Sequence, residues 1–282
     1  MNSGVGLIND IDNCVLEKGD MAFWWLGQLG YVIKLGEVVI YLDAFLSTEL
    51  DRNIPPLLKP EEIINADFII GTHDHKDHID RSIWHQLSLS SPKSKFIVPK
   101  LLINDLSTDL DIPMNRFIGL DDGIWISEKG LKITAIPSAH ELLHQDPDSG
   151  SYPYLGYIIE GNGCTMYHSG DTCIYEGMYS KLRHWDKFDV MFIPINGRDA
   201  KRYRENCIGN MTYQEAVDLA GSINPKLVVP GHYEMFTGNS ENPLLFADYI
   251  DAKYSEVKYW IGNHGEMVKL SDYFIYNRKE SI

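Results

Sequence analysis

Three histidines and three aspartates fall within residues 72–80, in the stretch THDHKDHID. His73, His75, Asp77 and His78 follow the spacing H-x-H-x-D-H, and in an extended loop alternate side chains point the same way. Imidazole and carboxylate groups bind divalent transition metals, so this spacing predicts a metal site able to serve two neighbouring ions. Because no thiolate belongs to the set, the residue types fit Zn, Mn, Fe and Ni alike. The alternative interpretation is a solvated polar loop.

A metal site of this kind predicts hydrolytic chemistry. Water bound to such an ion can lose its proton near neutral pH, because the metal lowers the water pKa from about 15.7 to about 7. The resulting hydroxide is the expected nucleophile. Two divalent ions outweigh two carboxylates and one hydroxide in charge, so we expect an anionic substrate and a negatively charged transition state.

The elements that position the motif can be read from the flanking sequence. Residues 21–43 predict three short strands, separated at Gly27, Gly30 and Gly36. The apolar run in ADFIIGTH predicts another strand, and the stretch after the motif has helical spacing with Asp80 as its N-cap. The motif is therefore expected in a loop between a strand and a helix.

The rest of the chain alternates strands with helices. LKITAIPSAH and SKFIVP predict strands, and YLGYIIE and CTMYHSGD predict a hairpin that turns at residues 161–163. FDVMFIPING, PKLVVPGH and VKYWIGN predict further strands, with one helix opened by a capping box from Thr212 to Glu215 and another by Pro243. With no repeat or linker between them, these elements predict one α/β domain over residues 1–282, in which helices cover two packed sheets.

The composition excludes several classes of protein. Lys plus Arg number 25 and Asp plus Glu 40, which gives a net charge of −15, so nucleic acid is not expected as a partner. The sequence has neither an export signal at its start nor an apolar run long enough to cross a membrane, so no membrane association is expected. Four cysteines without a CxxC pair indicate reduced thiols and a cytoplasmic protein.

The motif resembles that of the metallo-β-lactamase superfamily, whose two-metal sites lie at the edge of an αββα sandwich. Three later positions match the family's remaining ligands in order: His140 in IPSAH, Asp171 in HSGD and His232 in PGH. The resemblance implies that these residues hold two ions, with Asp171 bridging them. The implied sets are His73, His75 and His140 for one ion, and Asp77, His78 and His232 for the other. Asp43 resembles the carboxylate that orients a ligating histidine in this family.

A closer resemblance is to the L-ascorbate-6-phosphate lactonase group, through FWWLGQLGYVI, THDHKDHID and YHSGDT. It implies a cytoplasmic lactonase acting on a phosphorylated sugar lactone, often with manganese and in a homo-oligomer. Asp77 and Asp171 are the expected catalytic carboxylates, with Asp77 also carrying a proton. The sequence differs from the group at Gln28, where many relatives have histidine, and in PGHYEMF, which has one histidine instead of a pair.

Other residues are candidates for substrate contact or support. NGRDAKRYR follows an expected strand and concentrates positive charge in an acidic chain, so Arg198, Lys201 and Arg202 are predicted to bind the substrate's phosphate or carboxylate. A solvated basic loop or a subunit contact is the alternative. His264 is a candidate for substrate contact, with a structural role in a turn as the alternative. His168 is expected behind the ligands or in the core.

Other functions fit parts of the same sequence. HELLH at residues 140–144 matches the zinc-protease motif H-E-x-x-H with Glu141 as the base, but the strand before it and DPDSG after it leave too little room for the required helix. A nuclease or phosphodiesterase of the same fold is a second enzymatic alternative, because the same nucleophile attacks phosphorus. A non-catalytic metal-binding module is the third.

Overall fold

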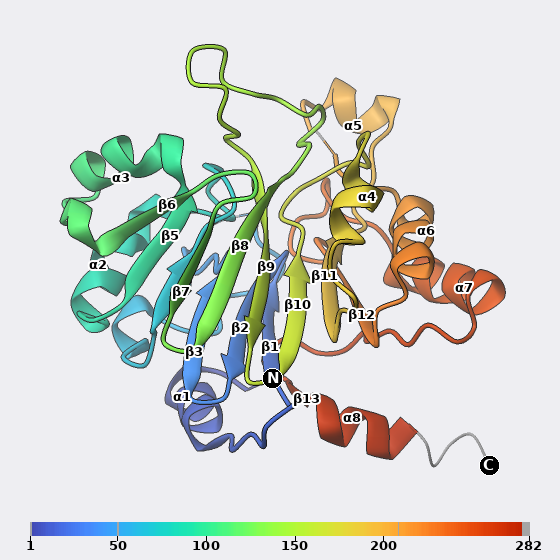
Figure 1. The fold of residues 1–282 in the computed structure, drawn as a ribbon, viewed down its shortest axis with the longest axis horizontal. Coiled ribbons are helices and arrows are strands. Elements are labelled where there is room, and N and C mark those ends of the chain that lie inside the picture. Colours follow the sequence, from blue (N-terminus) through green and yellow to red (C-terminus); the bar gives the residue numbers. More distant parts are fainter. Residues whose placement is uncertain (1, 50, 208, 278–282) are drawn as a thin grey trace.

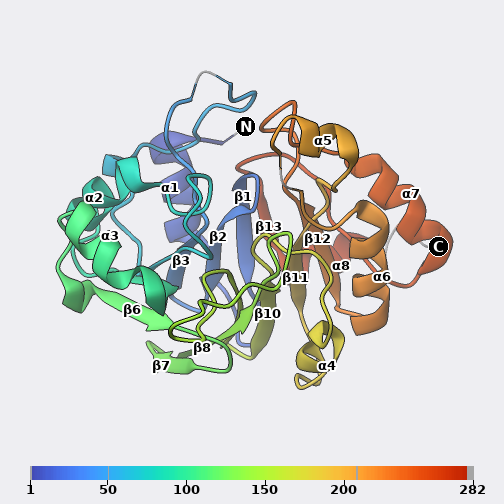
Figure 2. The same cartoon turned by 90° about the horizontal axis from the view of Figure 1, so that it is seen from above.

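Two mixed β-sheets form the centre of the molecule in the computed structural model, which describes residues 2–49, 51–207 and 209–277. The seven-stranded sheet has the spatial order β13 (Met267–Lys269), β1 (Ala22–Gly27), β2 (Gly30–Leu35), β3 (Val38–Leu42), β4 (Phe68–Ile70), β5 (Lys95–Pro99) and β6 (Phe117–Leu120). The six-stranded sheet has the order β12 (Leu227–Gly231), β11 (Val190–Pro194), β10 (Cys164–His168), β9 (Leu155–Gly161), β8 (Leu131–Pro137) and β7 (Trp125–Glu128). Seen from above, the two sheets lie between two groups of helices (Figure 2). The predicted αββα sandwich is confirmed.

Helices cover the outer face of each sheet (Figures 1 and 2). The seven-stranded sheet is flanked by α1 (Gly4–Asn13), α2 (Arg81–Ser90) and α3 (Ile103–Asp109), with the 3-10 turns η1 (Pro60–Glu62), η2 (Lys100–Leu102) and η3 (Met114–Arg116). On the side of the six-stranded sheet lie α4 (Met178–Leu182), α5 (Ala200–Arg204), α6 (Tyr213–Ile223) and α7 (Pro243–Lys253), and α8 (Leu270–Asn277) ends the described chain. Within this described part, no helix combines the length and the apolar character needed to span a bilayer.

Strand β1 shows how alternation of side chains makes the layers. Phe23 and Trp25 point into the cluster between the sheets, whereas Trp24 belongs to the cluster beneath the helices. The indole nitrogen of Trp24 donates a hydrogen bond to Asp10 of α1, at 2.8 Å. Successive residues of one buried strand therefore attach the sheet to both of its neighbouring layers.

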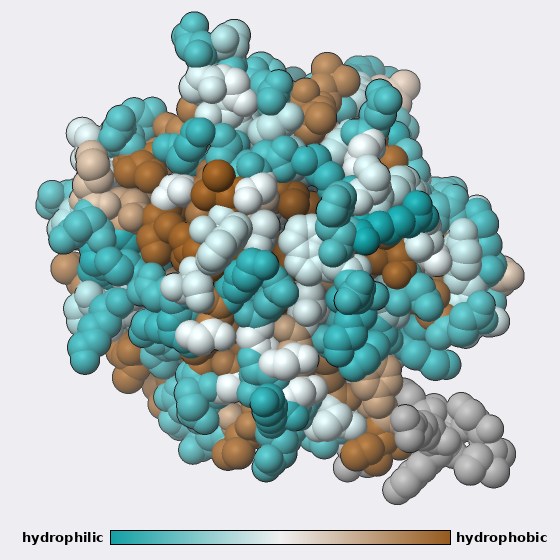
Figure 3. All heavy atoms as spheres, viewed as in Figure 1, coloured by the Kyte–Doolittle hydropathy of each residue, from teal (hydrophilic) through white to brown (hydrophobic). Residues whose placement is uncertain are grey.

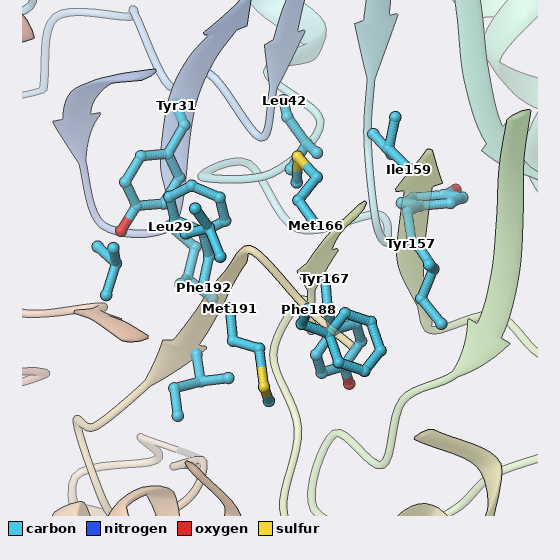
Figure 4. Packing of buried hydrophobic residues seen from close by; sticks show 14 of the residues in the cluster. Leu29, Tyr31, Leu42, Tyr157, Ile159, Met166, Tyr167, Phe188, Met191 and Phe192 are labelled. Carbon is cyan, nitrogen blue, oxygen red and sulfur yellow. The ribbon is translucent and has the colours of Figure 1, made fainter. Parts of the chain in front are cut away.

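The layer between the sheets is aromatic. The ring of Phe192 on β11 lies 5.2 Å from the ring of Phe23 and 4.3 Å from that of Tyr31, so residues of the two sheets are in direct contact. Figure 4 shows Leu29, Tyr31 and Leu42 facing Met166 and Phe192. Burial of this surface is the main stabilising term of the sandwich. The outer surface is different: in Figure 3 polar side chains cover much of the visible face, with apolar ones in small groups between them.

Several predicted elements differ in detail. Residues 257–263 form only an isolated bridge, in which Tyr259 pairs with Val228, so the strand predicted for VKYWIGN is wrong. Asp80 does precede α2, but its carboxylate makes no capping bond to that helix. It accepts hydrogen bonds from the backbone of Leu46 and Ser47 instead, which ties the loop after β3 to the start of α2.

Candidate functional site

The candidate ligands lie in loops that follow the carboxyl ends of strands. β3 and β4 are parallel, and so are β10, β11 and β12, which places the loops after them at one edge of each sheet. The motif at residues 73–78 follows β4 of the seven-stranded sheet. His140, Asp171 and His232 follow β8, β10 and β12 of the six-stranded sheet. The two sheets therefore contribute from opposite sides to one place.

Three overlapping groups of side chains have spacing suited to a metal ion. Within each group the candidate ligand atoms lie within 4.8 Å of one another. The groups are His73, His75 and His140; His73, His78 and Asp171; and Asp77, His78 and His232. The structure thus brings together all seven residues that the resemblance implied as ligands, in the same two outer sets.

Asp171 lies between the two outer groups. Its Oδ2 atom is 3.7 Å from Nε2 of His140 and 3.1 Å from Nε2 of His232, and its Oδ1 atom is 3.4 Å from Nε2 of His78. A carboxylate that reaches histidines of both groups has the position of a bridging ligand.

Several polar atoms in the centre of the site have no hydrogen bond. Nε2 of His78, Nε2 of His232 and Oδ1 of Asp171 are buried and make none within the described residues. Leaving a buried polar atom unsatisfied usually costs about 1–3 kcal/mol. With the imidazoles neutral, these atoms are lone-pair donors gathered in one place, so a divalent cation fits the site and would satisfy them.

A carboxylate and a hydroxyl hold the ligating histidines from behind. Oδ2 of Asp43 lies 2.6 Å from Nδ1 of His78, as predicted for an orienting carboxylate. Thr72 donates its backbone N–H and its hydroxyl to the two oxygens of Asp43, each at 2.8 Å, and its Oγ1 lies 3.0 Å from Nδ1 of His73. Sequence reasoning missed Thr72, although its position directly before the motif was a usable signal.

His168 is not in any of the three groups. Its Nε2 lies 2.8 Å from the carbonyl of Leu29, its Nδ1 accepts a hydrogen bond from the N–H of Gly170 at 3.2 Å, and Nε2 is 4.0 Å from Asp43. The ring therefore joins the loop that carries Asp171 to the turn between β1 and β2, a supporting position behind the ligands.

Opposite charges in the site shift its protonation. Burial alone would lower the pKa of His78, but Asp171, Asp43 and Asp77 raise it well above the usual value. Burial and the nearby His78 lower the pKa of His73 well below its usual value. Against the effect of burial, His78 and His232 hold the pKa of Asp77 below the usual value, so Asp77 is ionised at neutral pH. Within this chain alone, the carboxylates thus favour the charged form of His78, whereas burial favours the neutral form of His73.

A cleft of about 880 Å³ opens beside Asp77. Its lining comes from residues 51–53, from Lys76 and Asp77, from α5 and its flanks, and from the loop of residues 236–240. Four cationic side chains line the cleft: Arg52, Lys76, Lys201 and Arg202. Four carboxylates, those of Asp51, Asp77, Asp199 and Glu205, line it as well. A cleft of this size suits a small molecule, and its cations can hold an anionic group of that molecule.

A family comparison agrees with this geometry. The model of the beta-lactamase superfamily domain matches residues 39–233, more than half of the chain. The chain belongs to the beta-lactamase superfamily. That range includes the whole H-x-H-x-D-H motif, His140, Asp171 and His232.

Relatives within the beta-lactamase superfamily are similar over most of their length. A metal-dependent hydrolase of Sulfurisphaera tokodaii, of family UPF0173, is 30% identical over 74% of this chain and 82% of its own. A probable L-ascorbate-6-phosphate lactonase of Escherichia fergusonii is 24% identical over 91% of this chain and 81% of its own. The structure of Igni18, a metallo hydrolase of Ignicoccus hospitalis, is 22% identical and covers 89% of this chain and 98% of its own, with a TM-score of 0.70.

The basic residues around this superfamily site divide into two kinds. Lys201 and Arg202 line the cleft, and of these two Arg202 already pairs with Asp199 and Glu241. Arg198 does not line it, because its guanidinium forms a two-pronged ion pair with Glu215 at the start of α6. We therefore leave Arg198 out of the proposed substrate contacts. Arg52, which sequence reasoning missed, takes its place in the cleft wall.

His264 lies outside the cleft lining. Its ring stacks on Trp25 with centroids 3.8 Å apart, and it lines a smaller hollow beside residues 265–267. Burial and then the charge of Arg52 lower the pKa of His264 to about 4. The geometry favours the structural alternative for this residue over substrate contact.

The second histidine motif has no structural counterpart. Glu141 and His144 are exposed and lie in the long loop between β8 and β9, which projects from the top of the molecule in Figure 1. Glu141 has a positive φ of 68°, which is incompatible with a regular helix. Residues 140–144 therefore do not form the helix that a zinc protease of the H-E-x-x-H type requires.

Proposed function

We propose that this protein hydrolyses a small anionic substrate, a phosphorylated sugar lactone, with one or two divalent ions held by the seven clustered residues. In its coarser form this statement rests on the family: the chain is a metal-dependent hydrolase of the beta-lactamase fold. The observation that carries the finer statement is the cleft beside Asp77, whose wall includes Lys201, a cation without an ion pair among the described residues. The similarity to a probable ascorbate-6-phosphate lactonase supports a lactone as substrate.

The residues divide the work. When bound, divalent ions would supply a water acidic enough to ionise at neutral pH, with manganese or zinc the expected metal. His73, His75 and His140 would hold one ion, Asp77, His78 and His232 the other, and Asp171 would touch both. Asp77 borders the cleft, where its carboxylate is placed to accept a proton and pass it to the leaving group. The cations of the cleft would hold the substrate's phosphate.

The proposal is tested by assaying Mn-, Zn- and Fe-loaded protein on phosphorylated lactones, phosphodiesters and peptides. We expect lactone hydrolysis, lost by at least about 100-fold in His73→Ala and Asp171→Ala because each substitution removes an inferred ligand. Glu141→Gln is the matched control, since its side chain is exposed in the β8–β9 loop, and should keep full activity.

Three outcomes would contradict the proposal. Activity that survives both His73→Ala and Asp171→Ala would exclude the clustered residues as its source. Loss of activity in Glu141→Gln alone would restore the zinc-protease interpretation. A clear preference for phosphodiesters over lactones would favour the phosphodiesterase alternative, with the same metal site and a different use of the cleft.

A further inference from the structure

Gln28 lies directly behind the Asp77, His78 and His232 group, in the turn between β1 and β2. The residue is fully buried and has a positive φ of 51°. Its carbonyl accepts hydrogen bonds from the N–H of His232 at 2.9 Å and from the indole of Trp25 at 3.0 Å. A Cβ atom on Gly231 would lie 3.0 Å from that carbonyl oxygen, so the strand before His232 approaches this turn closely. The backbone of Gln28 is therefore fixed against the loop that carries His232.

The side chain of Gln28 touches two members of this group. Its Nε2 donates a hydrogen bond to Oδ2 of Asp77 at 3.1 Å and lies 3.4 Å from Nδ1 of His232. Its Oε1 is buried and has no partner within the described residues. One amide thus connects two side chains from different sheets and still has an unused acceptor.

The histidines of the site differ in the hydrogen-bond partner of Nδ1, the ring nitrogen that would face away from the metal ion. Nδ1 of His78 has the carboxylate of Asp43, and Nδ1 of His73 has the hydroxyl of Thr72. For Nδ1 of His232, the described residues offer only the amide of Gln28. A histidine that binds metal through Nε2 carries its proton on Nδ1 and needs an acceptor there. Rotating the amide of Gln28 by 180° would exchange Nε2 and Oε1, so that Oε1 would accept the proton on Nδ1 of His232. Asp77 would then lose its hydrogen bond from the amide and would bind the metal ion instead.

We propose that Gln28 is the positioning residue of the second metal position, the one formed by Asp77, His78 and His232, and that its amide supplies the acceptor for His232. The inference rests on the proposed two-metal site. The first position, formed by His73, His75 and His140, has no hydrogen bond to Gln28, so a change at Gln28 should affect it less.

Two substitutions separate this role from a general effect on folding. Gln28→Leu keeps a similar volume but removes both polar atoms, so the second Zn²⁺ should bind about 10–100-fold more weakly, with the first unchanged within about 3-fold. Gln28→Glu keeps an acceptor for His232 and should retain the second Zn²⁺ within about 3-fold. In the metal-free protein it places a carboxylate against Asp77, so its thermal midpoint should fall below that of the wild type.

The measurement is Zn²⁺ titration against a chromophoric chelator, with zinc per chain from elemental analysis and thermal midpoints of the metal-free proteins. Gln86→Leu, at a partly exposed position of α2, is the matched control and should leave both ions and the midpoint unchanged. Equal weakening of both ions in Gln28→Leu, or of neither, would overturn the proposal. Loss of the second ion in Gln28→Glu as large as in Gln28→Leu would overturn the acceptor role. Wild-type protein that binds a single Zn²⁺ would overturn the two-metal site itself.

Discussion

The hydroxyl of Thr72 lies among three side chains of the site. Its Oγ1 is 2.8 Å from Asp43, 3.0 Å from His73 and 3.3 Å from His78, and all of these atoms are buried. One small group therefore sets the rotation of two imidazoles from behind. Because charge-assisted hydrogen bonds to a carboxylate are among the stronger ones, its removal should be felt in both folding and metal binding.

Thr72→Val keeps the shape of the side chain and removes this hydroxyl. We expect the free energy of unfolding to fall by about 1–3 kcal/mol and Zn²⁺ affinity to fall about 10–100-fold. Urea unfolding and metal titration measure the two effects. Thr134→Val is the matched control, because the hydroxyl of Thr134 is buried without a partner and its loss should be neutral or stabilising. Equal effects of the two substitutions would contradict this prediction.

His264 gives a pH dependence that is separate from the metal site. Its pKa of about 4 in the folded protein compares with about 6.5 in an unfolded chain, so the unfolded chain binds more protons between these values. The contribution of neutral His264 to the free energy of unfolding is complete above about pH 6.5 and is lost as the pH falls towards 4. In metal-free protein, urea unfolding at pH 7 and pH 4.5 should show wild type losing about 2–3 kcal/mol more than His264→Phe, which keeps the ring on Trp25. Equal losses of unfolding free energy in wild type and His264→Phe would contradict this prediction.

At the scale of elements, the segment that leads through α5 to α6 carries cations with two different roles, substrate binding and stabilisation of the fold. Arg198 is committed to Glu215, whose carboxylate also accepts from the N–H of Thr212 in the capping box. Lys201, only three residues further on, lies in the cleft wall and makes no ion pair with any described residue. Neighbouring cations of the same basic segment, Arg198 and Lys201, therefore have different surroundings.

This difference predicts opposite effects of two substitutions. Lys201→Ala should raise KM for the anionic substrate about 10-fold and leave kcat and stability unchanged, because a charge-assisted contact to substrate is lost. Arg198→Ala should lower the free energy of unfolding by about 1 kcal/mol and leave KM unchanged. Steady-state kinetics and urea unfolding of both variants test this. A raised KM in Arg198→Ala alone would place the substrate at α6 instead of in the cleft.

Most elements could be predicted from the sequence because their signals are local. Alternation and turn residues predicted β1, β2 and β3, and the capping box predicted α6. Strand β7 was missed because it is an exposed edge strand of only four residues, and β13 because it has only three. Residues 257–260 looked like a strand because they are apolar, but only one bridge to β12 forms.

The candidate site was predictable where residue type and spacing carry the chemistry, as in the motif at residues 73–78. Thr72 and Arg52 were missed because their roles depend on contacts that spacing does not encode. Arg52 is held by the carbonyls of Phe45 and Ser47, and its cleft is closed by α5, far along the chain. A charge cluster in the sequence does not reveal which of its members already has a partner, as Arg198 has in Glu215.

At the scale of the whole molecule, the two sheets form one core. Phe192 of one sheet packs against Phe23 and Tyr31 of the other, so Phe192→Ala should lower the free energy of unfolding by about 3–5 kcal/mol. If residues 1–282 are one domain, as predicted, tryptophan fluorescence and circular dichroism should follow a single coincident transition in wild type and variant. Two separate transitions would divide the chain into independently folding parts.

Each outer metal group draws residues from both sheets: His73 and His75 with His140, and Asp77 and His78 with His232. A bound ion would therefore act as a cross-link between the sheets, in addition to its part in the reaction. An ion present at about 1,000 times its dissociation constant adds about 4 kcal/mol to the stability of the state that binds it. Neither sheet alone carries a complete group, so the ion would bind only after the sheets have packed in register. Chelation would then weaken the contact between the sheets while leaving the hydrogen bonds within each sheet in place.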